Sequence, residues 1–235
     1  MRTHRILDCT FENNSKSYSE ISSNQRGTGV LTIYSTNASI KTSNFSSNRN
    51  DRGGAIFFQS SSKPSRLSIS QTGFKKNKAL FGGSIYVQSE SHGLDIKIDG
   101  SYFSANNADN FGGAIYFSLS GSNDQVSCLL SRNIFVVNQA GGGQSDGSGG
   151  AIYFGSAGRL SLINNTFEIN TAITGGGALY YEGGSVLYSA GNIFSENVAH
   201  DETGGAVSVS NADYTDENNT YLGKILCLSR ILRYH

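Results

Sequence analysis

The stretch Phe103–Phe117, which reads FSANNADNFGGAIYF, decides the fold because its two motifs recur along almost the whole chain. The first motif is a Phe followed three residues later by an Asn, and the second is a Gly-Gly pair that runs into an apolar segment. Six copies carry both motifs at intervals of about 27 to 37 residues, a period typical of solenoids. The Phe and Asn positions are Phe45 and Asn48, Phe74 and Asn77, Phe103 and Asn106, Phe135 and Asn138, Phe167 and Asn170, and Phe194 and Asn197. The Gly pairs are Gly53 and Gly54, Gly82 and Gly83, Gly112 and Gly113, Gly149 and Gly150, Gly176 and Gly177, and Gly204 and Gly205.

An apolar pair with the spacing of a β-strand lies seven and five residues before each Phe. The pairs are Ala38 and Ile40, Leu67 and Ile69, Ile96 and Ile98, Cys128 and Leu130, Leu160 and Leu162, and a weaker Leu187 and Ser189. Spacing by two with polar residues between places one face of a strand inward and the other outward. With the Gly-Gly segment and the segment that ends in Phe, each repeat is predicted to hold three short strands.

The Gly-Gly strand also predicts a column of outward aromatic side chains. Ile115 and Phe117 face the core by the strand period, so the residue between them points outward. The outward column is Phe57, Tyr86, Tyr116, Tyr153, Tyr180 and Ser208. Two interpretations stay open. The rings stack from coil to coil and stabilise the sheet, or Tyr86, Tyr116, Tyr153 and Tyr180 form a surface that binds a glycan or another partner.

Strands that recur at one repeat length stack in parallel, so the sequence predicts an all-β parallel β-helix, a solenoid of about seven coils. Residues 1–224 are expected to form a single repeat domain that starts and ends in mid-coil. Residues 225–235 break the composition and are expected to be an atypical tail or cap, as a strand or a short helix.

The corners of each coil have predicted roles. The Asn after Phe is expected to adopt the left-handed conformation and to hydrogen-bond the equivalent Asn of the neighbouring coils. The Gly pair is expected where a Cβ would clash or a positive φ is needed. The long insert 139–148 is expected to be a flexible surface loop.

Composition excludes several functions. The 18 acidic and 18 basic residues balance and are scattered, so neither nucleic acid nor an anionic membrane is expected as a partner. No segment has the apolar core of a signal peptide or the roughly 20 apolar residues of a membrane span. Cys9, Cys128 and Cys227 lack metal-like spacing. His4, His92, His200 and His235 are isolated. No metal and no cofactor is therefore expected.

The pairing of Phe-x-x-Asn with Gly-Gly-Ala-Ile resembles the repeats of the chlamydial polymorphic membrane proteins, from about Phe11 to Tyr221. The resemblance implies a right-handed parallel β-helix displayed at the outer membrane or outside the cell as an adhesin. It also implies that this chain is part of a longer protein and that membrane attachment occurs only through other regions.

Catalysis has to be considered because many right-handed β-helices of the pectin-lyase-like fold are polysaccharide lyases or hydrolases. Glycoside hydrolysis needs two carboxylates about 5 to 9.5 Å apart. The acids of the repeats fall at different repeat positions: Asp95, Asp99, Asp109, Asp124, Asp146, Glu168, Glu182, Glu196, Asp201 and Glu202. No catalytic residue is assigned. The expected function is a non-enzymatic surface adhesin or structural stalk segment whose partner is a protein or glycan of a host or neighbouring cell. A carbohydrate-active enzyme and a glycan-binding module remain the alternatives.

Overall fold

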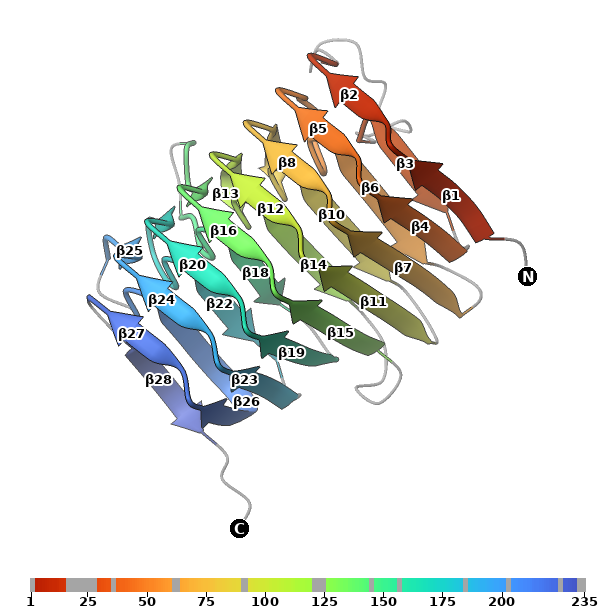
Figure 1. Ribbon diagram of the computed structural model, residues 1–235. Helices are drawn as coiled ribbons and strands as arrows, with labels where there is room; N and C mark the ends of the chain where they lie inside the picture. The colour runs from red at the N-terminus through yellow and green to blue at the C-terminus, as the bar shows by residue number, and fades with distance from the viewer. Residues whose placement is uncertain are drawn as a thin grey trace.

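The computed structural model describes residues 3–15, 29–34, 37–60, 64–89, 93–119, 126–143, 146–155, 158–183, 186–201, 204–223 and 226–231. These residues contain strands and no helix, and every strand pairing is parallel. The coils stack side by side as a right-handed parallel β-helix, with β1 and β28 at opposite ends (Figure 1). The predicted fold class is confirmed.

Four parallel sheets run along the stack, each named here by its place in the coil. The glycine sheet follows the Gly pairs: β3 (Leu31–Tyr34), β6 (Ile56–Ser60), β10 (Ile85–Ser89), β14 (Ile115–Leu119), β18 (Ile152–Gly155), β22 (Leu179–Glu182), β26 (Val207–Glu217) and β28 (Leu226–Ile231). The middle sheet holds the apolar pairs: β1 (Thr3–Leu7), β4 (Asn37–Lys41), β7 (Ser65–Ser70), β11 (Leu94–Asp99), β15 (Val126–Ser131), β19 (Arg159–Ile163) and β23 (Val186–Ala190).

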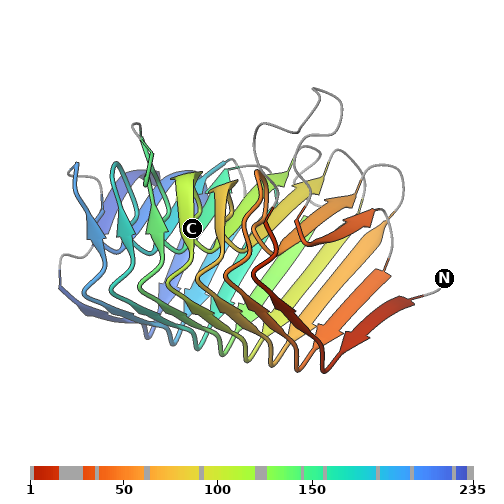
Figure 2. The ribbon, with the colours of Figure 1, turned by 90° about the horizontal axis from the view of Figure 1, so that it is seen from above.

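The phenylalanine sheet consists of β2 (Thr10–Glu12), β5 (Asn44–Ser46), β8 (Gly73–Lys75), β12 (Tyr102–Ser104), β16 (Ile134–Val136), β20 (Thr166–Glu168), β24 (Ile193–Ser195) and β27 (Thr220–Leu222). The short sheet consists of β9 (Lys78–Phe81), β13 (Asn107–Phe111), β17 (Gln139–Ala140), β21 (Thr171–Ala172) and β25 (Val198–Ala199). Seen from above, each coil returns to the same place one layer along (Figure 2).

The three predicted strands per coil are present, and the short sheet adds a fourth that the motif alignment missed. Its signal is an Ala two residues after four of the ladder Asn residues, at Ala79, Ala108, Ala140 and Ala172, where every side chain is buried. The prediction that residues 139–148 form a flexible surface loop is therefore wrong in part. It begins with β17, Ser148 bridges to Gly175, and residues 144–145 lie outside the described residues.

At the C-terminal end, β26 runs through the corner as one strand and pairs with both β22 and β23. The expected tail 225–235 contributes β28, which pairs with β26 in parallel and extends the glycine sheet. Of the alternatives open for this segment, a strand forms.

The core fills the coil with inward side chains from three sheets. Ile115, Phe117, Ile96, Ile98 and Phe103 are fully buried, and register pairs each with its equivalent in the next coil. The Phe side chains form a continuous stack from Phe11 to Tyr221, with ring centroids 4.6 to 5.2 Å apart and planes within 4 to 9° of parallel. Each Phe is the middle residue of its strand, so the strand continues one residue further than predicted.

Asn side chains form a ladder at the corner between the phenylalanine and short sheets. The Asn106 side-chain amide donates to Asn138 Oδ1 at 2.9 Å and to the Phe74 carbonyl at 3.0 Å. Asn106 Oδ1 in turn accepts from the backbone and side-chain nitrogens of Asn77. The same contacts join Asn14, Asn48, Asn77, Asn106, Asn138, Asn170 and Asn197. The predicted ladder is confirmed.

The prediction that the ladder Asn adopts the left-handed conformation is wrong. The residue before each ladder Asn adopts it instead. Ala105 has a φ of 52° and Val137 a φ of 55°, and each directly precedes a ladder Asn. Because the preceding residue makes the sharp turn, the Asn itself is free to direct its amide along the stack. The corner therefore requires the Asn for its hydrogen bonds and not for its backbone conformation.

A second polar ladder lies at the opposite end of each phenylalanine strand, two residues before each Phe. Asn133 N and Nδ2 donate to Asn165 Oδ1 at 2.9 and 3.0 Å, and the pattern continues through Asn192 to Asn219. In earlier coils Ser101 and Thr72 occupy the position. The sequence signal is a column of Ser, Thr or Asn, which is easily missed because the residue type changes.

The two glycines of each pair are required for different reasons. Gly112 has a φ of +67°, which L-residues rarely adopt. A Cβ on Gly113 would overlap the carbonyl oxygen of Gly150 in the next coil. Both predicted reasons for the Gly pair are confirmed, one at each position.

Replacing Asn106 by Ala should lower the free energy of unfolding by at least about 3 kcal/mol, because several buried donors and acceptors lose their partners. Asn107→Ala is the matched control. The Oδ1 atom of Asn107 has no partner among the described residues, and its amide makes only a 3.4 Å contact to Gln139. That control should cost less than about 1 kcal/mol. Urea unfolding followed by circular dichroism measures both, and equal losses in the two variants would contradict the role of the ladder.

Candidate binding surface

The aromatic column is the candidate site, and the glycine sheet positions it. Tyr86, Tyr116 and Tyr153 are each the second residue of a strand, β10, β14 and β18, and the parallel register pairs them directly. The core residues on either side of Tyr116, Ile115 and Phe117, point inward, so the Tyr points away from the core. The predicted direction of the column is confirmed.

The rings of this column stack on one another. Centroids lie 5.5 Å apart from Phe57 to Tyr86 and 5.1 Å apart at each of the next three steps through Tyr116 and Tyr153 to Tyr180. Interplanar angles fall between 14 and 29°. The interpretation of the column as a cross-coil stack is confirmed.

The last residues of two short-sheet strands, together with Arg52, cover part of the column. Phe81 and Phe111 approach Tyr116 with centroids 5.5 and 6.5 Å away, and the Arg52 guanidinium lies 5.5 Å from the Tyr86 ring centroid. Tyr86 is consequently only 6% exposed. Neither Phe81 nor Phe111 was recognised in the sequence, and their signal is an aromatic residue directly before a Gly pair.

The stack limits how the column can bind a ligand. A ring that is stacked on both sides, such as that of Tyr116, has no free face for a sugar ring, and the buried Phe57 and Tyr86 offer almost no contact surface. Tyr116, Tyr153 and Tyr180 are half-buried and keep an exposed edge. The chemistry available to a ligand is therefore hydrogen bonding at phenol edges together with contact to ring edges.

Burial changes the acidity of these three phenols. Desolvation raises the pKa of Tyr116, Tyr153 and Tyr180 above the ordinary value, and the carboxylate of Glu182 raises the pKa of Tyr153 and Tyr180 further. The Tyr153 hydroxyl points at Glu182 Oε2 at 3.4 Å. All three phenols are neutral hydrogen-bond donors at neutral pH.

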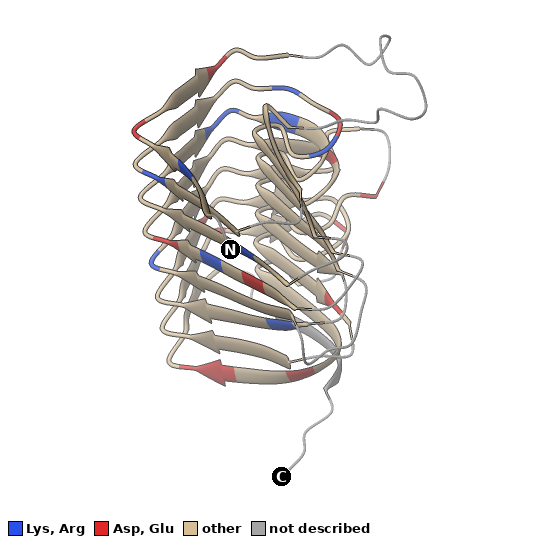
Figure 3. Cartoon of the chain, turned by 90° about the vertical axis from the view of Figure 1, so that its right-hand side faces the viewer, with Lys and Arg blue, Asp and Glu red and all other residues tan. Residues whose placement is uncertain are grey.

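The acids of the sequence are spread over different sheets. Asp95 and Asp99 lie on the middle sheet, where they pair with Arg66 at 2.8 Å and Arg132 at 2.6 Å. Asp109 on β13 pairs with Lys78 at 2.8 Å. Glu168 lies on the phenylalanine sheet and Glu182 at the end of β22. Basic and acidic residues are scattered along the coils (Figure 3).

Asp124, Glu202, His92 and His235 lie outside the described residues. His4 lies on β1 at one end of the stack and His200 follows β25 near the other, so the structure does not bring them together. Within the described ranges, no group of three or more His, Cys, Asp or Glu side chains gathers as a metal site. Across the same ranges, no helix has the length and hydropathy to cross a membrane.

A second polar cluster ends the Phe stack and was not predicted. Tyr214 and Tyr221 both donate to Asp216 Oδ2, at 2.9 and 2.8 Å. The side-chain amide of Asn219 donates to the same carboxylate. Tyr221 occupies the Phe column, and its hydroxyl gives the last ring of the stack a polar edge. Its sequence signal is the change from Phe to Tyr in the last copy.

Comparison with known proteins adds no assignment. No protein-family model matches the chain, and no curated protein or solved structure matches it.

The raised phenol pKa values predict instability at alkaline pH. The folded state keeps these tyrosines neutral. This preference contributes its full stabilisation below about pH 10, the pKa of tyrosine in the unfolded chain, and the stabilisation is lost as the pH rises above that value. We expect the absorbance of ionised tyrosine to rise in two phases, the second coinciding with loss of the β-sheet circular dichroism signal. Tyr153→Phe should move the unfolding midpoint to higher pH.

Tyr102→Phe is the matched control, because Tyr102 is 44% exposed on the phenylalanine sheet. It should leave the unfolding midpoint in place. A single ionisation step near pH 10 with unchanged circular dichroism would contradict the buried stack.

Proposed function

We propose that this chain is a non-enzymatic, surface-displayed β-helix that serves as an adhesin or as a segment of a structural stalk. The proposal rests on the structural roles of the recurrent residues. Phe103 and Asn106 are buried in the stack and the ladder, and Gly112 and Gly113 form the corner. The residues that recur are therefore occupied with building a stiff body.

The outer surface of the β-helix supports a role in binding. On the phenylalanine sheet, the outward positions change in residue type from coil to coil, whereas the inward position is Phe in seven coils and Tyr221 in the last. The residue before the Phe, for example, is Gly73, Tyr102, Ile134 and Thr166 in four successive coils. A scaffold with a fixed interior and variable outer columns can present a specific surface to a partner, as extended repeat proteins do.

The half-exposed phenol edges favour a glycan as one class of receptor. Tyr116, Tyr153 and Tyr180 form a row of neutral donors along the stack, spaced by one coil each. Sugar hydroxyls accept hydrogen bonds from such groups, and ring edges add apolar contact. A protein of a host or neighbouring cell is the other receptor class.

The resemblance of the repeat to polymorphic membrane proteins supports display outside the cell, at the outer membrane or beyond it. The carbohydrate-active enzyme remains the alternative. It receives less support, because Asp95, Asp99 and Asp109 already pair with Arg66, Arg132 and Lys78.

Beads coated with the 235-residue chain should adhere to cultured cells in a saturable manner, and soluble chain should compete. Treating the cells with protease or with glycosidases then separates a protein receptor from a glycan. Tyr153→Ala should reduce binding several-fold if a glycan contacts the phenol row, with Tyr34→Ala as the exposed control. Adhesion equal to that of albumin-coated beads, or release of sugar from a polysaccharide panel, would contradict the proposal.

A further inference from the structure

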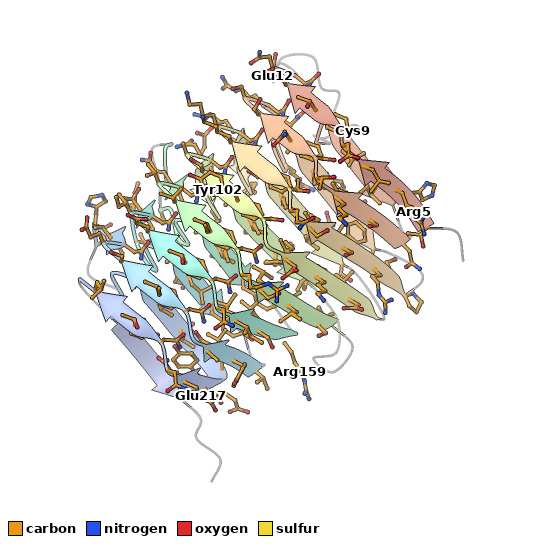
Figure 4. The ribbon with its side chains drawn as sticks, in the orientation of Figure 1. Arg5, Cys9, Glu12, Tyr102, Arg159 and Glu217 are labelled. Atoms are coloured by element: carbon orange, nitrogen blue, oxygen red, sulfur yellow. The ribbon has the colours of Figure 1, made fainter. Side chains whose placement is uncertain are left out.

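The outer face of the phenylalanine sheet gathers most of the exposed apolar side chains. Nine large hydrophobic residues are exposed among the described residues, and six lie on this face. These six are Tyr102, Ile134, Val137, Ile169, Ile193 and Leu222. Tyr102 is labelled on β12 in Figure 4. Contiguous exposed apolar surface of this kind marks an interaction site in a soluble protein.

The face is built from three outward columns, which together are called the pairing face. They are the residues one before, one after and two after each member of the Phe column. At β12 these are Tyr102 and Ser104 with Ala105 directly after the strand, and at β16 they are Ile134 and Val136 with Val137 directly after the strand. The parallel register holds equivalent residues one strand apart, about 4.8 Å.

Around Tyr102 on β12 and Ile134 on β16, the nearest charges on the two sides differ in sign. Lys75 and Lys76 are exposed at β8, one strand before β12. Glu168 is exposed on β20, one strand after β16, and Glu196 lies one coil further on. None of these four side chains forms a salt bridge within the described residues.

We propose that the pairing face binds a second copy of this chain, face to face and with the two solenoid axes antiparallel. A two-fold axis parallel to the strands, passing between β12 and β16, leaves β8 and β20 at equal distances on either side. It therefore brings Lys75 opposite Glu168 of the second copy and Tyr102 opposite Ile134 of the second copy. Lys76 comes within one coil of Glu196 of the second copy.

The parallel arrangement of two copies is disfavoured by the same charges. A two-fold axis along the solenoid would place each coil against its own equivalent. Lys75 and Lys76 would then lie at the same coil level as the lysines of the other copy, and these positive charges repel one another. Charge complementarity selects the antiparallel pair.

The size of the face sets the strength of the contact. Eight strands spaced about 4.8 Å apart and three columns of side chains give roughly 400 Å² per copy. The total of roughly 800 Å² is small, so the dimer should be reversible, with a Kd between about 10 µM and about 1 mM.

Sedimentation equilibrium of the 235-residue chain up to about 1 mM tests the proposal. We expect a monomer–dimer equilibrium, which Ile134→Glu abolishes. Lys75→Glu and Glu168→Lys should each weaken dimerisation about tenfold, and the double variant Lys75→Glu/Glu168→Lys should restore it. Lys97→Glu, an exposed change on β11 of the middle sheet, is the control and should leave the Kd unchanged.

Circular dichroism melting of each variant checks that the fold is retained. A wild-type chain that stays monomeric up to about 1 mM would overturn the proposal. So would failure of the folded double variant to regain the wild-type Kd, or a loss in Lys97→Glu equal to that in Lys75→Glu. The readout is mass in solution, so the result is independent of the adhesion experiment.

Discussion

The Asn ladder at the corner of each coil is the constraint on which the rest of the structure depends. A parallel β-helix must turn sharply after each phenylalanine strand, and the turn leaves backbone donors and acceptors inside the body. Asn106 satisfies them with one side chain, since its amide reaches both the next Asn and a carbonyl of the preceding coil. Because each ladder Asn contacts its equivalents, the ladder also fixes the register of every sheet.

Once the corner is fixed, the other recurrent residues follow from it. In-register coils place one Phe over the next, which allows the nearly parallel stack of Phe74, Phe103 and Phe135. The ladder also stabilises a backbone conformation that is unfavourable by itself. Val137 keeps a φ of 55°, which is strained for a β-branched residue, because its neighbour Asn138 is held by Asn106 of the preceding coil and Asn170 of the next. Outward positions carry no such constraint, so they are free to vary and to meet a partner.

The sequence predicts those features in which one residue type repeats at one position. The Phe stack, the first ladder and the Gly corner are of this kind, and so is the outward direction of Tyr116. Features in which the residue type changes from coil to coil were missed. Ser101 and Asn133, for example, occupy equivalent positions of the second ladder although one is a Ser and the other an Asn. The left-handed turn was placed one residue late because Ala105 and Val137 carry no signal for it. The cover that Phe81 gives Tyr116 depends on the path of the corner, which spacing alone does not reveal.

Hydrogen exchange on a sample labelled with ¹⁵N only at Asn tests the central role of the ladder most directly. The backbone and side-chain amides of Asn48, Asn77, Asn106, Asn138 and Asn170 should exchange only through global unfolding and share one free energy of opening. The side-chain amides of Asn44, exposed on β5, and Asn107 should exchange orders of magnitude faster. Ladder amides that exchange as fast as those of Asn44 and Asn107 would contradict the account.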